Sequence, residues 1–293
     1  MTLVVLGYGY SSAAFVAAVR DRFERVVVTV RGADKAARLA AEGLEVCRLG
    51  PDGMDPALPG VISTATALMS SVPPDSAGDP VLGRPELAAA LAGATGLRWV
   101  GYLSTVGVYG DHGGGWVDED TPVRPVSPRS VQRVAAEQAW QALGAGSGPP
   151  VHIFRLAGIY GPGQNALANL AGGTARRIVK PGQVFNRIHV EDIAGALAAS
   201  LQHPQPGGAV YNVTDDEPAP PQDVVAYAAD LLGMPVPPDL PFASAELSPM
   251  ARSFYGENKR VSNARLRALG WVPRYPTYRE ALEGLFAAGE GRR

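Results

Sequence analysis

The chain has 293 residues, 46% of them hydrophobic, and its 26 basic and 28 acidic side chains leave a formal net charge of -2. This is enough apolar material for one large core or two unequal lobes, and the near-neutral charge without a basic stripe argues against nucleic acid as a partner. No apolar stretch approaches the roughly 20 residues that span a bilayer, and there is no basic leader, so we expect a cytoplasmic protein without membrane contact.

The first segment predicts a strand, a tight turn and a helix in direct succession. Leu3–Leu6 is a short apolar run, typical of a strand buried on both faces of a parallel sheet. Gly7 and Gly9 permit a tight turn, and 12–19 is a small-residue helix whose amino end would face a pyrophosphate. The spacing is G-x-G-x-x-S, with Ser12 at the third glycine position, and a turn without any ligand is the alternative interpretation. The expected cofactor contacts in this loop are Gly7, Gly9, Tyr10 and Ser11.

Strands and helices then alternate, which predicts an α/β fold with a doubly wound parallel sheet of the Rossmann type. The predicted strands are 26–30, 45–49, 60–65, 97–104 and 151–156, and the predicted helices are 34–42, 85–92 and 130–143. Beyond residue 160 glycine and proline interrupt the pattern, and the further predicted elements are 191–201, 209–213, 222–232 and 263–269. The predicted domains are an NAD(P)-binding Rossmann domain of 1–160 with 187–213, and a smaller substrate-binding lobe of 161–186 with 214–293.

Five motifs resemble, in their order, those of extended short-chain dehydrogenases/reductases, the family that includes NAD-dependent epimerases and dehydratases. They are LSTVGVYGD (103–111), FRLAGIYGPG (154–163), RIHVEDIAGAL (187–197), YNVTDDEP (211–218) and NKRVSNARLRALGW (258–271). The resemblance spans almost the whole chain, and within the family the chain is similar to the atypical YeeZ-like branch. It implies a nicotinamide cofactor and a small-molecule substrate or ligand between two lobes, and it leaves the oligomeric state open.

The resemblance also bears on the choice between NADP and NAD. In NAD binders an acidic residue about 20 residues after the glycine loop binds the ribose hydroxyls, whereas an arginine there suits a 2′-phosphate. Here Arg31 ends the second strand and the first acid beyond it is Asp34, so NADP is favoured, with a solvated surface arginine as the alternative. The end of the predicted fourth strand would lie against adenosine, unless its small residues serve packing alone. The remaining expected cofactor contacts are Ser63, Thr64, Ala65, Ser104, Arg133 and Leu156.

Catalysis in this family normally uses three groups. A Ser or Thr after the fifth strand holds the reacting oxygen, a Tyr transfers the proton, and a Lys four residues later lowers the pKa of that Tyr and binds the nicotinamide ribose. Thr105 matches the first role, with Ser104 as its neighbour. Counting back from Ala-Ala-Glu at 135–137, which resembles the A-A-E after the motif lysine, places Arg129 at the tyrosine position and Arg133 at the lysine position.

The usual pair is absent in any register. No tyrosine lies between Tyr109 and Tyr160, and this helix contains no lysine. Arg133 keeps a positive charge and hydrogen-bond donors for the ribose. Arg129 cannot replace the phenol, because a guanidinium with a pKa above about 12 does not exchange protons at neutral pH. Tyr109, Tyr160 and His189 are the candidates for the vacant role, and each has an alternative interpretation as a pocket wall or a helix start.

No metal site is expected. Cys47 is the only cysteine, and the four histidines are too far apart in sequence for a short zinc-ligand spacing. The loop 111–116 fits a substrate lid better than a metal site. Two classes of function remain: an NADP-dependent oxidoreductase or epimerase/dehydratase with an altered proton donor, and a catalytically silent NADP-binding sensor or scaffold. The pocket motifs favour the enzyme, and the missing pair favours the sensor.

Overall fold

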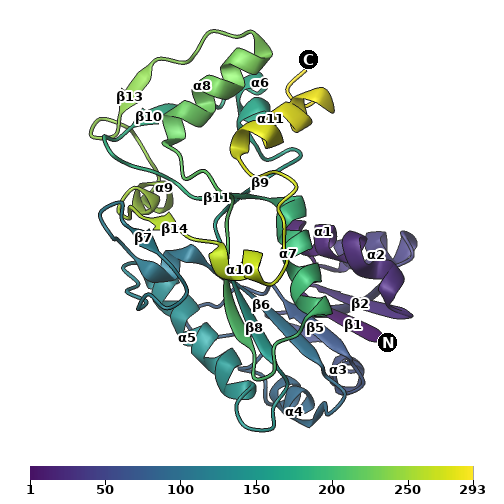
Figure 1. Cartoon of the computed structure of the whole chain (residues 1–293). Coiled ribbons are helices and arrows are strands. Elements are labelled where there is room, and N and C mark those ends of the chain that lie inside the picture. The colour runs from purple at the N-terminus through teal and green to yellow at the C-terminus, as the bar shows by residue number, and fades with distance from the viewer. Residues whose placement is uncertain (293) are drawn as a thin grey trace.

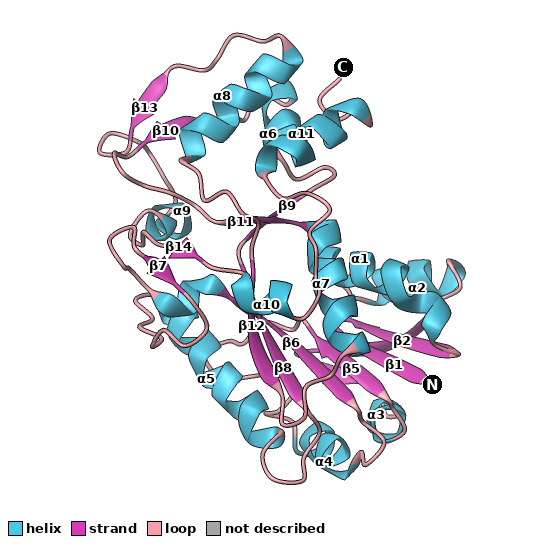
Figure 2. Ribbon diagram, viewed as in Figure 1, coloured by secondary structure: helices cyan, strands magenta, loops and turns pink. Residues whose placement is uncertain are grey.

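The computed structural model describes residues 1–292, whose main sheet has eight strands (Figures 1 and 2). In order across the sheet they are β12 (Ala209–Val213), β8 (Val151–Leu156), β6 (Trp99–Thr105), β5 (Ala67–Ser70), β1 (Thr2–Leu6), β2 (Arg25–Val30), β3 (Glu45–Gly50) and β4 (Gly53–Met54). Neighbouring strands are parallel except for β3 and β4. The order runs outward in both directions from β1, so the predicted doubly wound Rossmann sheet is confirmed.

Helices cover both faces of this sheet (Figure 1). One face carries α1 (Tyr10–Val19), α2 (Ala33–Ala41) and α7 (Val190–Gln202), and the other carries α3 (Leu58–Ser63), α4 (Pro85–Gly93) and α5 (Pro128–Leu143). Leu3 and Val5 of β1 pack in the first core, whereas Val4 and Leu6 pack in the second, and all four are fully buried. A strand covered on both faces needs an apolar run without alternation, which is the pattern the sequence has there.

The predicted fourth strand is wrong. Residues 60–65 fall mostly in helix α3, and the strand between β1 and β6 is β5, which begins at Ala67. Pro59 lies in the first turn of α3, a position that favours helix initiation, and Val61 and Ile62 bury the helix against the sheet. A short apolar run does not distinguish a strand from a buried helix, and here the proline was the overlooked signal.

A second core forms the upper part of the molecule in Figure 1. It is built by α6 (Ala166–Ala171), α8 (Pro221–Leu232) and α11 (Tyr278–Ala287). Leu167, Val224, Ala228 and Leu282 are among its buried side chains. Beside it lies a two-stranded parallel pair, β10 (Arg177–Val179) with β13 (Asp239–Pro241).

Short parallel pairs connect the second core to the main sheet. These pairs are β9 (Gly158–Tyr160) with β11 (Arg187–His189), and β7 (Trp116–Val117) with β14 (Arg260–Val261). Between them and the C-terminus, α10 (Ala264–Ala268) lies beside β12, and Leu266 and Trp271 pack in the first core of the sheet. The segment 260–271 therefore departs from the predicted division, which assigned it to the smaller lobe.

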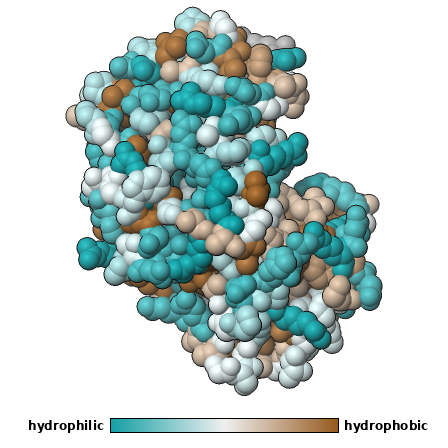
Figure 3. Space-filling model, in the orientation of Figure 1, coloured by the Kyte–Doolittle hydropathy of each residue, from teal (hydrophilic) through white to brown (hydrophobic). Residues whose placement is uncertain are grey.

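The face of the molecule seen in Figure 3 is largely hydrophilic, with apolar residues in small separate patches. Two of the large exposed apolar side chains, Met250 and Phe254, belong to the short helix α9 (Pro249–Phe254), which has no buried residue. Within residues 1–292, no helix combines the length and the apolar character needed to cross a bilayer.

Candidate functional site

The glycine loop after β1 forms a cradle at the carboxyl edge of the sheet. Gly7 has a φ of +87°, and a Cβ at this position would lie 2.9 Å from Oγ of Ser71, so only glycine fits. The N–H of Gly7 donates to Oγ1 of Thr29 at 2.8 Å, which ties the loop to β2. Gly9 is the N-cap of α1, and a Cβ at this position would extend into open space, with no contact within 4 Å beyond its own stretch of described chain. The start of α1 therefore presents its backbone N–H groups without a capping side chain.

Ser12, at the third glycine position, has a structural task of its own. Its hydroxyl donates to the carbonyl of Gly7 at 2.7 Å and lies 2.9 Å from Oγ of Ser71, whose hydroxyl also donates to Gly7 O at 2.6 Å. Ser71 directly follows β5, so sequence analysis missed it when it misplaced the fourth strand. A serine after an apolar strand of the sheet was the available signal.

The expected adenosine contacts Ser63, Thr64 and Ala65 are at the wrong edge of the sheet. They end α3 and precede β5, and the register pairs Ala67 with Leu3, near the beginning of both strands. Ligands bind at the carboxyl ends of parallel strands, so the reason for assigning these residues to the cofactor is removed.

A cavity of about 370 Å³, here called the cradle cavity, joins the glycine loop to the ends of β6 and β8. Seven of the predicted site residues line it: Gly9, Tyr10, Ser11, Ser104, Thr105, Arg133 and Leu156. Gly7 shapes the loop beneath. The structure thus brings these residues together, and their contact with a cofactor stays a prediction.

Arg31 lies outside this cavity, exposed at the end of β2. Lys35 follows it along the chain, in the first turn of α2. Its ammonium donates to the carbonyl of Tyr8 in the glycine loop at 2.6 Å. The sequence alone gave no reason to select Lys35. Two cations therefore stand beyond the glycine loop on the β2 side.

The two arginines at the vacant catalytic positions lie on α5 and differ in their surroundings. Arg133 is half-buried and lines both the cradle cavity and a second one, while its Nη1 donates to Leu103 O at 2.8 Å and to the Tyr102 hydroxyl at 2.9 Å. Arg129 is exposed, lines only the second cavity, and has Nη1 3.0 Å from Sδ of Met250. Arg133 is thus anchored at the meeting point of two cavities, and Arg129 stands at the mouth of one.

The second cavity, here called the large cavity, has a volume of about 740 Å³. Its walls come from the ends of β6 and β8, the start of α5, β9, β11 and helix α9. The charged lining residues are Arg129, Arg133, Arg187, Lys259 and Glu257. Lys259 and Glu257 pair with each other at 2.6 Å, which leaves three arginines without a lining acid. Apolar side chains such as Phe185 and Phe254 share the wall, so the cavity suits an organic anion.

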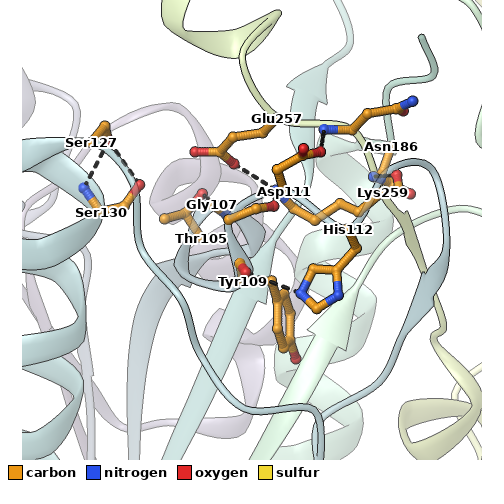
Figure 4. Close-up of polar contacts among 12 residues, drawn as sticks. Thr105, Gly107, Tyr109, Asp111, His112, Ser127, Ser130, Asn186, Glu257 and Lys259 are labelled. Carbon is orange, nitrogen blue, oxygen red and sulfur yellow. Dashed lines mark hydrogen bonds and ion pairs between the residues drawn. The ribbon is translucent and has the colours of Figure 1, made fainter. Parts of the chain in front are cut away.

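Hydroxyl groups gather beside Thr105 in this cavity (Figure 4). Oγ1 of Thr105 accepts from the N–H of Gly107 at 3.1 Å. Ser130 is buried on α5, and its Oγ accepts from the hydroxyl of Ser127 at 2.9 Å, which leaves the Ser130 proton free to donate. Sequence analysis missed both serines, although Ser127 before Pro128 is the pattern of a helix N-cap.

Tyr109 does not fill the vacant proton-transfer role, because it points away from the cavities. Its side chain is fully buried, its hydroxyl donates to Asn212 at 2.7 Å and accepts from Arg155 at 2.9 Å, and it lines neither cavity in the part of the chain that the structure describes. Burial raises the pKa of its phenol, which opposes ionisation. Figure 4 shows its ring directed toward the strands.

Arg155 forms a buried ion pair with Glu137, at 2.8 Å between Nη2 and Oε2. Glu137 also accepts a hydrogen bond from the hydroxyl of Ser104. This network locks α5, one turn after Arg133, to the ends of β6 and β8. Ser104 therefore holds the wall of the cradle cavity in place as well as lining it.

The other two candidates differ in position. Tyr160 lies on the wall of the large cavity, and burial raises the pKa of its phenol. His189 is 1% exposed, lines neither cavity within residues 1–292, and accepts at Nδ1 from the N–H of Glu191 at 3.3 Å as the N-cap of α7. Burial lowers the pKa of His189, so the ring is neutral at pH 7. His189 is therefore a structural residue, and Tyr160 alone of the three reaches a cavity.

The loop 111–116 is hydrogen-bonded to the segment around Asn258 and, within residues 1–292, lines neither the cradle cavity nor the large cavity, where a lid would be expected. Asp111 accepts from the N–H of Asn258 at 2.8 Å, and the N–H groups of His112 and Gly114 donate to Asn258 O at 3.0 and 2.9 Å. Lys259 next to it donates to Gly110 O at 2.8 Å (Figure 4). The short helix α9 covers the large cavity instead. Among residues 1–292, no cluster of His, Cys, Asp and Glu is suited to a metal ion.

Comparisons with known proteins show the family of the chain. Residues 75–214 match the NAD dependent epimerase/dehydratase family. The 3-diazoavenalumate denitrifying reductase of Streptomyces sp is 31% identical over 238 residues, which are 75% of this chain and 76% of that protein. Protein YeeZ of Escherichia coli (strain K12) is 39% identical over 140 residues, 46% of this chain and 47% of YeeZ. A solved structure of a conserved protein from Silicibacter pomeroyi DSS is 52% identical, covers 99% of both chains and has a TM-score of 0.88.

More distant structures share the fold and were solved with different cofactors. MoeE5 in complex with UDP-glucose and NAD is 21% identical, with a TM-score of 0.75 over 97% of this chain and 96% of that one. Human epimerase family protein SDR39U1 with NADPH is 20% identical, with a TM-score of 0.74 over 97% and 98%. The motif order, the doubly wound sheet and these relatives agree, and the chain belongs to the NAD-dependent epimerase/dehydratase family and resembles YeeZ, as its sequence predicted.

Proposed function

We propose that the protein is an NADP-dependent oxidoreductase that acts on a small organic anion in the large cavity. The observation that carries the proposal is the meeting of the glycine loop, Thr105 and Arg133 along the wall that the cradle and large cavities share. The family match and the reductase relative support the same class of reaction.

The cradle suits a dinucleotide. Gly9 leaves open space above the start of α1, whose first backbone N–H groups lack a side-chain cap. Such N–H groups bind a pyrophosphate, and the helix dipole favours its charge. Arg133 lies in the second turn of α5, and Ser104 lies near the end of β6. Both would face the nicotinamide end of the cofactor. When bound, the nicotinamide supplies or accepts the hydride.

Arg31 and Lys35 support NADP over NAD. Both cations lie beyond β2, where a 2′-phosphate binds in NADP-dependent relatives of this fold. The same fold holds NAD in MoeE5 and NADPH in SDR39U1, so the choice depends on side chains at this place rather than on the backbone.

Arg31→Ala tests the choice of cofactor. The parent is expected to bind NADPH more tightly than NADH, and the variant to lose roughly 10- to 150-fold in NADPH affinity, because a charge-assisted contact contributes about 1.5 to 3 kcal/mol. Calorimetric titration with each nucleotide measures both affinities. Arg38→Ala is the matched control, since Arg38 lies on the helix α2 that follows Arg31 and pairs with Glu42 at 2.8 Å. Equal affinity of the parent for NADPH and NADH would contradict the assignment.

The large cavity indicates what the substrate carries. Arg129 at the mouth, together with Arg187, attracts an anionic group, while the apolar wall of α9 accommodates an apolar or aromatic body. Thr105 and Ser130 provide hydroxyls that hold a polar atom at the reacting end.

The arginine at position 129 restricts the reaction. It cannot give a proton to an alkoxide, so the site favours an acceptor whose reduction forms none. The relative from Streptomyces is named as a reductase that removes nitrogen from a diazo compound. Hydride addition to a diazonium group with loss of dinitrogen leaves no alkoxide, and therefore needs no phenol at position 129. We extend this class of acceptor to the present protein.

A catalytically silent NADP-binding sensor is the second candidate. The same substitution at position 129 favours it, since a sensor needs the cradle and Arg133 but no proton donor. The two candidates differ in whether hydride leaves the bound nucleotide.

A further inference from the structure

A third cavity, here called the lobe cavity, lies in the smaller lobe. Its volume is about 530 Å³, within the range of small-molecule sites. Val224 of α8 and Leu282 of α11 give it an apolar wall. Tyr160 of β9, Arg187 of β11 and Tyr278 at the start of α11 give it polar groups.

Two enclosed hydroxyls at this cavity lack partners. Tyr160 and Tyr278 are 8% and 1% exposed, and neither hydroxyl has a hydrogen-bond partner within residues 1–292. A buried polar group left without a partner costs about 1 to 3 kcal/mol. A ligand acceptor that reaches either hydroxyl would remove that cost for it.

Arg187 supplies charge at the same place. Its Nη1 donates to the carbonyls of Phe185 and Ala219 at 3.0 Å each, and within the described residues its other guanidinium nitrogens have no hydrogen-bond partner. The side chains of both unpartnered tyrosines interact electrostatically with this guanidinium. Both phenols and this guanidinium belong to the wall of one cavity.

The charged side chains that line the lobe cavity favour an anion, and the nearby carboxylates, such as Glu217 beside Tyr278 and Glu280 beside Tyr160, act from outside its lining. Arg176 lines the lobe cavity as well as Arg187, and no Asp or Glu within residues 1–292 does. Asp215 is a buried acid whose charge acts on Arg187 without lining the cavity, and burial raises the pKa of its carboxyl to about 8. At neutral pH this carboxyl is mainly protonated, so it does not cancel the arginine charge.

We propose that the lobe cavity is a second ligand site, which takes a small oxyanion whose oxygens accept hydrogen bonds from Tyr160, Tyr278 and Arg187. Carboxylates and phosphates share this chemistry. Tyr160 and Arg187 also line the large cavity, so the two cavities share a wall, but Tyr278 and Arg176 line only the lobe cavity. The proposal that the lobe cavity binds an anion does not depend on whether the protein turns over a substrate.

Calorimetric titration of the full chain with sodium malonate and, separately, sodium phosphate tests this site, with sodium chloride as the ionic-strength control. Saturable binding of at least one of the two anions is expected, and the one that binds identifies a carboxylate or a phosphate ligand. Tyr278→Phe should weaken it roughly tenfold or more, because it removes one hydrogen bond to a charged acceptor. The matched control is Tyr255→Phe, which removes a phenol that lines only the large cavity and should change the affinity less than twofold.

Two results would overturn the proposal. One is the absence of saturable binding of either anion. The other is binding that Tyr278→Phe leaves unchanged, which would place the anion outside the lobe cavity, as in the large cavity. Tyr278→Phe is expected to fold, since the hydroxyl it removes has no partner in the described chain. If Tyr278→Phe fails to fold, Arg176→Ala at the exposed rim of the lobe cavity replaces it as the test. We expect this variant to lose several-fold in affinity for the anion, and an unchanged affinity would contradict the site.

Discussion

Arg133→Ala is expected to weaken NADPH binding roughly 10- to 150-fold, the effect of losing about 1.5 to 3 kcal/mol of charge-assisted contact. Arg133 lies where the cradle and large cavities meet. Its Nη1 is anchored on Leu103 O and the Tyr102 hydroxyl, which holds the guanidinium at the wall and leaves its other donors for a ribose. Calorimetric titration with NADPH measures the loss.

Arg129→Ala is the matched control for this variant. Arg129 lies one helical turn earlier on α5 but is exposed and lines only the large cavity, so its removal should change NADPH affinity less than twofold. If both single variants bind NADPH as the parent does, Arg133 is not at the ribose, and the placement of this helix relative to the family motif is wrong.

Arg155→Met is expected to lower the free energy of unfolding by about 3 to 5 kcal/mol, because it leaves the buried carboxylate of Glu137 without its cation. The two side chains are only 8% and 4% exposed. Arg155 also donates to the hydroxyl of Tyr109, so a second buried group loses a partner. Equilibrium urea unfolding measures the change.

Two further variants make this result specific to burial. Glu137→Gln combined with Arg155→Met removes both charges and should recover much of the loss. Arg38→Met breaks the Arg38–Glu42 pair, whose side chains are 61% and 52% exposed, and should cost less than about 1 kcal/mol. A loss below about 1 kcal/mol in Arg155→Met would show that Glu137 is adequately solvated or otherwise paired.

Local patterns were sufficient to predict the central sheet and the glycine cradle. The apolar run of β1 followed by Gly7 and Gly9 predicts a buried strand and a tight turn, because a few neighbouring residues determine both features. The same approach failed at 60–65, where a six-residue helix and a strand have similar apolar content. That error moved the expected adenosine contacts to the opposite edge and concealed Ser71.

The remaining errors concern contacts between residues far apart in sequence. Tyr109 has a plausible position beside Thr105, but Arg155 and Asn212 turn its hydroxyl into the interior, and neither pairing follows from spacing. The strands β9 and β11 have three residues each, too few for any periodicity, yet they bring Tyr160 and Arg187 to one wall. Packing alone determines such positions.

Hydride transfer from deuterium-labelled NADPH tests the central claim most directly. The acceptors are para-carboxybenzenediazonium and para-carboxybenzaldehyde, which share the carboxylate and ring but differ in whether reduction forms an alkoxide, each with a protein-free control. We expect deuterated benzoate and dinitrogen from the diazonium, above the control, and no reduction of the aldehyde. Reduction of the aldehyde at a comparable rate would show that another group fills the proton-donor role. Transfer of deuterium to neither acceptor would contradict hydride transfer to this class of substrate and favour the silent NADP-binding protein.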